Sequence, residues 1–111
     1  MRHFYTVVLE RMQKYDTGFE TEPYETGWAS EAMFFIRTHA ISGRNVALDS
    51  QVQVSADGIN WINEGTEFPT IREVGDHFVK VSHFGGWLRI TCHLTGEQPE
   101  AEITVQLVLK E

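Results

Sequence analysis

Residues Val52 to Trp61 read VQVSADGINW, and this stretch decides the fold class. Val52 and Val54 alternate with polar residues, which is typical of a strand with one buried face. Ala56-Asp57-Gly58 predicts a turn, because glycine adopts positive φ without a steric penalty and aspartate bonds to its own backbone. A short strand over residues 59–63 follows and carries Trp61. The stretch therefore predicts a β-hairpin whose turn is fixed by Ser55 and Asp57, with Trp61 packed across it.

Short strand patterns separated by turn signals recur along the whole chain. The patterns cover residues 3–12, 30–41, 46–55, 59–63, 70–74, 77–84, 87–94 and 101–110, with turn signals at 42–45, 64–67, 85–86 and 96–100. Residues 14–27 predict a long loop or irregular edge strand, since Pro23 cannot donate to a central ladder. Seven or eight strands with this spacing favour an all-β, single-domain antiparallel β-sandwich of jelly-roll type spanning residues 1–111.

Alternation also predicts which side chains form the core. One side of each strong strand is apolar and is expected to face inward. These sets are Ala32, Phe34 and Ile36; Val46, Leu48, Val52 and Val54; Leu88, Ile90, Cys92 and Leu94; and Ile103, Val105, Leu107 and Leu109.

Charge and cysteine content limit which binding partners and which cellular compartment we expect. The net charge of −7 disfavours nucleic acid, whose phosphates require a basic stripe. The single cysteine, Cys92, excludes a disulfide within the chain. The segment MRHFYTVVLERM has neither the apolar core of a signal peptide nor the length of a membrane span. We therefore expect no membrane association and a place in the cytoplasm or within a larger protein assembly.

The sequence contains none of the common catalytic or metal-binding motifs. Five histidines are present, His3, His39, His77, His83 and His93, but no HxH, HExxH or CxxC occurs. Cys92 is expected to face inward as a small hydrophobic residue. No serine lies in a G-x-S-x-G motif, and Gly85-Gly86 lacks the residues of a phosphate-binding loop. We therefore expect no enzymatic activity, no metal and no cofactor.

Two strands are expected to carry large side chains on their outward sides. If the apolar sets face inward, Met33, Phe35, Arg37 and His39 face outward from one strand, and Trp87, Arg89, Thr91 and His93 from another; Gln51 and Gln53 are expected to extend the same surface. Aromatic residues, Met and Arg are enriched at protein–protein interfaces. Two alternatives remain: the aromatic segment 15–28 covers this face as part of the core, or the face binds sugar rings.

The hairpin and the last strands resemble those of known β-sandwich modules. The hairpin VQVSADGINW, the later strand Trp87-Leu88-Arg89-Ile90, the turn Thr95-Gly96 and the closing strand Thr104-Val105-Gln106-Leu107 are similar to elements of discoidin-like (F5/8 type C) modules and of phage virion-type β-sandwich proteins. The resemblance covers residues 46–109. It implies a β-sandwich, although this chain is shorter than a discoidin domain and lacks its terminal cysteine pair.

These features predict a non-catalytic structural or assembly module of virion, shell or scaffold type. We expect it to form a homo-oligomer or to join a larger protein assembly, because an open sheet must protect its edges and joining copies is one solution. The interface residues would be Met33, Phe35, Arg37, His39, Trp87, Arg89 and His93. The alternative function is a carbohydrate-binding module, with a glycan stacked on Trp28, Trp61 or Trp87.

Overall fold

The computed structural model describes residues 4–111, which form an all-β fold with no helix among them. The seven strands are β1 (Phe4–Tyr15), β2 (Phe19–Glu20), β3 (Tyr24–Glu25), β4 (Glu31–Ser55), β5 (Ile62–Glu67), β6 (Gly75–Ser82) and β7 (Trp87–Lys110). All strand pairs are antiparallel. His3, where the first strand was predicted to begin, lies outside the described residues. With no helix in residues 4–111, that part of the chain contains no candidate for a membrane-spanning helix.

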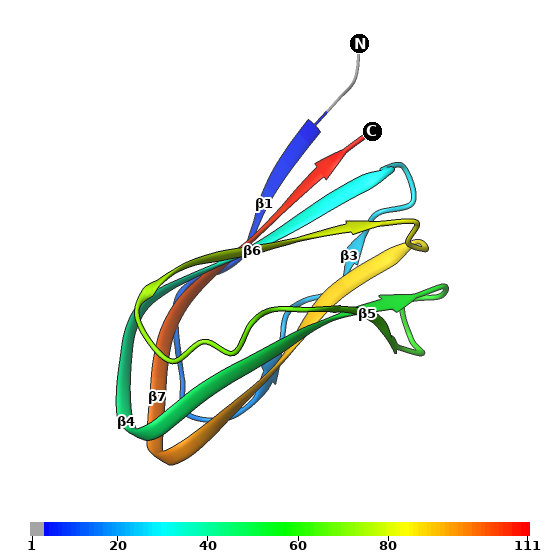
Figure 1. The fold of residues 1–111 in the computed structure, drawn as a ribbon. Coiled ribbons are helices and arrows are strands. Elements are labelled where there is room, and N and C mark those ends of the chain that lie inside the picture. The colour runs from blue at the N-terminus through cyan, green and yellow to red at the C-terminus, as the bar shows by residue number, and fades with distance from the viewer. Residues whose placement is uncertain (1–3) are drawn as a thin grey trace.

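Two long strands, β4 and β7, organise the molecule and pair with each other along most of their length. Both bend sharply near their middle, so that each contributes to two stacked layers (Figure 1). In the first layer, residues 101–110 of β7 and 31–41 of β4 lie between β1 and β6. In the second layer, residues 87–95 of β7 and 47–55 of β4 lie between the short strands β2 and β3 on one side and β5 on the other. The predicted single-domain β-sandwich is confirmed.

The bends explain why the chain has fewer and longer strands than predicted. Residues 42–45 and 96–100 were expected to be turns that end strands, but both segments lie inside β4 and β7. Gly43 and Gly96 have φ of 114° and 129°, and the register shifts between Thr38 and Ala47. Positive φ and bulges curve a strand without ending its hydrogen-bonded ladder. The chain therefore does change direction at both predicted sites, but within a continuous strand that passes from one layer to the other.

The core lies between the two layers and is formed mainly by the predicted inward side chains, with Phe68, Ile71, Val81 and Ala101 in addition. Phe34, Ile36, Leu48, Val52, Leu88, Ile90, Ile103, Val105, Leu107 and Leu109 have no exposed surface, and Cys92 is 1% exposed. Val54 is the exception among the predicted positions, because it is only partly buried at the edge of this cluster. The period of two that sets strand faces thus predicted the core correctly.

The segments between β4 and β7 differ most from the sequence prediction. Residues 64–67 were expected to form a turn, but they belong to β5, which begins at Ile62, after Trp61. The predicted strand over residues 70–74 is reduced to one bridge, in which Ile71 pairs with Leu48. Here the propensities of single short segments were overridden by pairing with the neighbouring strand β4.

Residues 14–27 continue the second layer at its edge. Phe19 pairs with Cys92, and Tyr24 pairs with Leu88, so their side chains are directed inward. Both rings pack against the core, and the Tyr15 ring stacks on that of Phe19 at 3.6 Å between centroids. The predicted irregular edge strand is confirmed. The alternative in which this segment covers the outward face of the sheet is wrong.

Candidate interaction surfaces

The predicted interface residues lie on two separate faces rather than on one. Met33, Phe35 and Arg37 face outward from the first layer, where they pair with β6 and with residues 104–108 of β7. His39 lies at the register shift between Thr38 and Ala40, and its ring contacts Thr104 on the same side. Trp87, Arg89, Thr91 and His93 face outward from the second layer, where they pair with residues 47–55 of β4. The bends in β4 and β7 direct the two groups away from each other. Gln51 and Gln53 extend the second group only, opposite Thr91 and Arg89.

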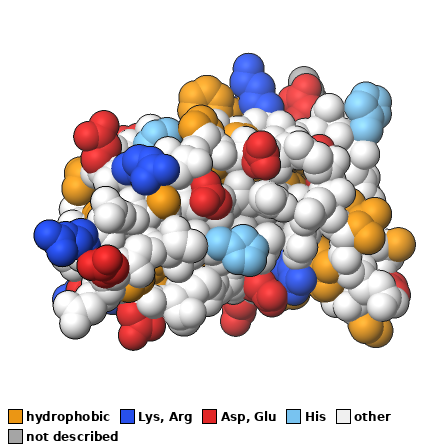
Figure 2. Space-filling model, turned by 60° about the horizontal axis from the view of Figure 1, so that its bottom comes forward, with side chains coloured by type: hydrophobic (Ala, Val, Ile, Leu, Met, Phe, Trp, Pro, Cys, Tyr) orange, Lys and Arg blue, Asp and Glu red, His pale blue; other side chains and the backbone are white. Residues whose placement is uncertain are grey.

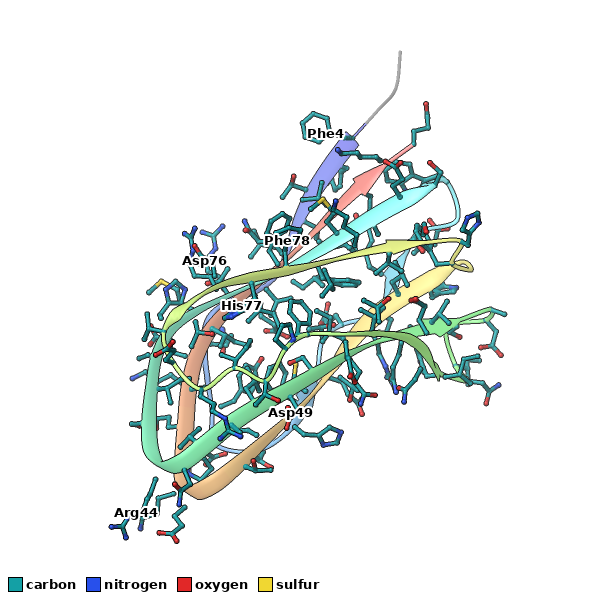
Figure 3. The ribbon with its side chains drawn as sticks, in the orientation of Figure 1. Phe4, Arg44, Asp49, Asp76, His77 and Phe78 are labelled. Atoms are coloured by element: carbon teal, nitrogen blue, oxygen red, sulfur yellow. The ribbon has the colours of Figure 1, made fainter. Side chains whose placement is uncertain are left out.

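An apolar surface crosses all four strands of the first layer. We call it the first-layer face, and its apolar members are Phe4, Val8, Met33, Phe35, Phe78 and Val108. The rings of Phe35 and Phe78 are 5.8 Å apart between centroids. Phe4 and Phe78 are 71% and 52% exposed, which is high for side chains of this size. Figure 3 shows Phe4 on β1 and Phe78 on β6, with Asp76 and His77 on opposite sides of β6.

Charges at the margin of the first-layer face nearly cancel. Its outward positions carry four basic residues, Lys14, Arg37, Lys80 and Lys110, and three acidic ones, Glu31, Asp76 and Glu102, although the whole chain carries −7. Arg37 Nε donates to Asp76 Oδ1 at 2.8 Å, and this hydrogen bond lowers the pKa of Asp76. His39 Nε2 lies 2.7 Å from Thr104 Oγ1. The acidic excess of the protein therefore lies elsewhere on its surface.

The outward face of the second layer is polar, and Arg89 is at its centre. Arg89 Nε donates to Gln53 Oε1 at 2.7 Å, and Arg89 Nη1 donates to Glu20 Oε2 at 3.2 Å. The guanidinium also lies 4.3 Å from the centroid of the Trp61 ring, within the range of a cation–π contact. Figure 2 shows mostly polar and charged side chains on the side it brings forward, with hydrophobic side chains mainly around its margin. This face differs sharply in chemistry from the first-layer face.

The three tryptophans do not present equivalent surfaces. Trp28 is 41% exposed in the segment between β3 and β4. Trp61 is partly buried and contacts Arg89. Trp87 lies beneath the hairpin turn, since a Cβ placed on Gly58 would be 3.1 Å from the Trp87 ring. The ring nearest the turn is thus Trp87, whereas Trp61 was predicted to pack across the hairpin.

The turn after Ser55 is fixed by the two side chains that the sequence indicated. Ser55 Oγ accepts from the backbone N–H of Gly58 at 2.8 Å. Asp57 Oδ1 accepts from the backbone N–H groups of Ile59 and Asn60 at 2.8 and 2.9 Å. These hydrogen bonds, with those from the side chains of Asn60 and Ser55, hold the pKa of Asp57 well below its usual range. The predicted structural role of Ser55 and Asp57 is confirmed.

The remaining reactive side chains are dispersed or buried. Burial raises the pKa of Cys92 to about 12, and the hydrogen bond from Ser50 offsets this only in part. His93 is exposed on the second layer, and His83 follows the end of β6. Among residues 4–111, no three His, Cys, Asp or Glu side chains converge as metal ligands. His3 lies outside the described residues.

Several surface residues were missed by the sequence interpretation. Phe4, Val8, Phe78 and Val108 complete the first-layer face, yet each belongs to a strand whose alternation was visible. Their outward direction follows from the same period-two rule, but their common location depends on strand order, which the sequence does not contain. Glu67 was missed because residues 64–67 were interpreted as a turn, and Asn63 because it was interpreted as the last residue of a short strand.

Comparisons with known proteins support the fold. The chain is similar to the crystal structure of the SPBc2 prophage-derived protein YomS, with a TM-score of 0.59 and 8% identity over 100% of this chain and 96% of that one. It is also similar to the CBM36-1 domain of a multidomain xylanase from the hindgut metagenome of Trinervitermes trinervoides, with a TM-score of 0.51 and 15% identity over 96% of each chain. No family model and no curated protein sequence matches the chain. At these identities the likeness shows a common β-rich fold, shared with a prophage protein and a carbohydrate-binding domain.

Proposed function

We propose that this protein is a non-catalytic structural module that self-associates through the first-layer face. The observation that carries the proposal is the outward apolar set on four adjacent strands, in which Phe4, Val8 and Phe78 are exposed and Phe35 is partly buried. Contiguous exposed apolar surface of this kind is typical of interaction sites on otherwise water-soluble domains. Burying it against a second copy would remove aromatic rings from water, which is the main favourable contribution in protein association.

Charge makes another copy of the chain a suitable partner. Two molecules of net charge −7 repel each other overall, and this repulsion is weakest where the local charge is not negative. The first-layer face meets that condition, because its four basic outward residues slightly outnumber its three acidic ones. Opposite charges at its margin, such as Lys80 and Asp76, also allow pairing between identical surfaces.

The size of the molecule is compatible with a stable contact. The structure measures 46 × 29 × 19 Å, so a broad side exceeds the ~800 Å² per partner of a standard interface. The fold is shared with the prophage-derived protein YomS, and that likeness concerns architecture alone. The carbohydrate-binding alternative depends on the opposite layer and is argued separately below.

The test is the mass in solution, measured by light scattering behind a sizing column at several protein concentrations. We expect a defined oligomer for the unmodified chain and a monomer for Phe78→Glu, because a carboxylate would be buried without a partner. Ile62→Glu is the matched control, since Ile62 is 68% exposed but lies on the second layer. That variant should keep the oligomer. A monomer at every concentration for the unmodified chain, or an unchanged mass for Phe78→Glu, would exclude this interface.

A further inference from the structure

A polar hollow lies between β4 and β5 on the second layer, away from the first-layer face. Gln51 pairs with Glu67 and Gln53 with Asn63, so β5 has extra residues between the two pairs. This bulge places Gly65 at φ 114° with open space where a side chain would be. The hollow has a volume of about 180 Å³ and is lined by Gln51, Asn63, Gly65, Thr66 and Glu67. Bulges often serve to redirect side chains at functional sites.

A chain of hydrogen bonds fixes the orientation of the Asn63 amide. Arginine can only donate, so Gln53 must direct its oxygen to Arg89 at 2.7 Å. The NH₂ group of Gln53 then donates to Asn63 Oδ1 at 3.1 Å. The Asn63 NH₂ group is consequently left as a donor at the hollow. Glu20 and Trp61 hold Arg89, whose side chain is only 16% exposed, so this arrangement exists before any ligand binds.

The other polar groups of the hollow complement this donor. Within residues 4–111, the Gln51 amide and the Glu67 carboxylate make no side-chain hydrogen bond. Thr66 Oγ1 donates to Glu64 at 2.8 Å, which leaves its oxygen as an acceptor. The hollow thus presents a fixed donor, a carboxylate acceptor and an amide that does both. Vicinal hydroxyl groups, which donate and accept at once, match such a set.

From this geometry we propose that the hollow is a carbohydrate-binding subsite for a neutral sugar. Anionic ligands are disfavoured, because Glu67 lines the hollow, Glu64 accepts a hydrogen bond from the lining residue Thr66, and Arg89 is already paired with Glu20. The volume is below the ~300–1,000 Å³ of sites for drug-sized ligands, so it suits one sugar ring of a longer chain. The proposed site contains none of the residues of the first-layer face and does not rest on self-association.

The experiment is titration of the ¹⁵N-labelled protein with neutral xylo-, cello-, manno- and chito-oligosaccharides at up to about 10 mM, which detects a Kd in the millimolar range. We expect amide shifts confined to residues 51–53, 61–67 and 89 with at least one sugar. Asn63→Asp should weaken binding at least tenfold, because it keeps the oxygen that Gln53 needs but replaces the donor with an acceptor. Glu67→Gln should also weaken binding, whereas Glu22→Gln, at an exposed acid outside the hollow, should not.

Three outcomes would overturn the proposal. The first is the absence of shifts with all four sugars while the protein remains folded. The second is a set of shifts centred on Trp28 rather than on the hollow, which would place the sugar elsewhere. The third is a response of the same amides to Ca²⁺ alone with none to sugar, which would indicate a cation site. Thermal unfolding of each variant verifies that Asn63→Asp and Glu67→Gln retain the fold.

Discussion

At the scale of single residues, Asp57 shows how one side chain defines a turn. Its carboxylate accepts hydrogen bonds from the backbone of Ile59 and Asn60 and from the side chains of Asn60 and Ser55. The donors are arranged to favour the ionised form, which is why the pKa of Asp57 is lowered. A sequence with Ser-Ala-Asp-Gly between two strands encodes this arrangement locally. The hairpin was therefore predictable without knowledge of the rest of the fold.

The lowered pKa predicts a specific dependence of stability on pH. Because the folded-state pKa of Asp57 lies below the unfolded value of about 4, its ionised form stabilises the fold above that pH. The contribution is lost progressively as the pH falls below about 4 toward the folded-state pKa. We expect Asp57→Asn to be less stable than the unmodified chain at pH 7, and the difference to shrink at pH 3. Urea unfolding at both pH values measures this.

Asp16→Asn is the control for this measurement, since Asp16 is an exposed aspartate outside the hairpin turn. Its stability should follow that of the unmodified chain at both pH values. A difference between Asp57→Asn and the unmodified chain that stays constant from pH 7 to pH 3 would contradict the electrostatic explanation. It would indicate instead that only the shape of the turn had changed.

At the scale of strands, the sequence predicted faces well and boundaries poorly. Leu88, Ile90 and Cys92 were assigned to the core correctly, because the period of two is a local property. Gly43 and Gly96 were interpreted as turn residues, because a local pattern does not distinguish a tight turn from a bend in a long strand. The distinction depends on pairing between β4 and β7, which are far apart in the sequence. The sequence did not predict that the candidate interface residues lie on two separate faces, for the same reason.

The bend in β4 yields a prediction with a matched pair of glycines. Gly43 and Gly65 share a φ of 114°, which L-residues rarely adopt, so an alanine at either site meets backbone strain. A Cβ at Gly43 would lie 2.6 Å from the carbonyl oxygen of Gln98, where the two bends lie side by side, whereas one at Gly65 meets nothing within 4 Å. We expect Gly43→Ala to be less stable than Gly65→Ala by about 1–3 kcal/mol, the usual range for overpacking.

Urea unfolding of both variants measures this difference. A shared Phe78→Glu background would keep self-association from contributing to the measured stability. Equal losses would mean that the bend moves to accommodate the extra methyl group. The paired bends of β4 and β7 would then be more deformable than the close backbone approach of Gly43 to Gln98 indicates.

At the scale of the whole molecule, the bent strands place two different chemistries back to back. The first-layer face is apolar and carries no net negative charge, while the second layer carries the polar hollow beside Arg89. A single flat sheet would offer both surfaces too, but it would leave no closed core between them. Self-association through the first layer would leave every copy with its second layer exposed. The two proposals thus combine into an assembly that displays several copies of one weak binding site.

This combination predicts avidity if both proposals hold. The oligomer should bind an immobilised polysaccharide about 100-fold more tightly than Phe78→Glu, because linked sites raise the effective concentration. Both proteins should bind a short oligosaccharide with equal affinity per chain, since Phe78 is on the opposite layer from Asn63 and Glu67. Surface plasmon resonance on the polymer and calorimetry with the short sugar separate the two quantities. Equal binding of both proteins to the polymer would show that the sites of one assembly cannot engage the polymer at the same time. Linking sites increases binding only where the geometry allows simultaneous engagement.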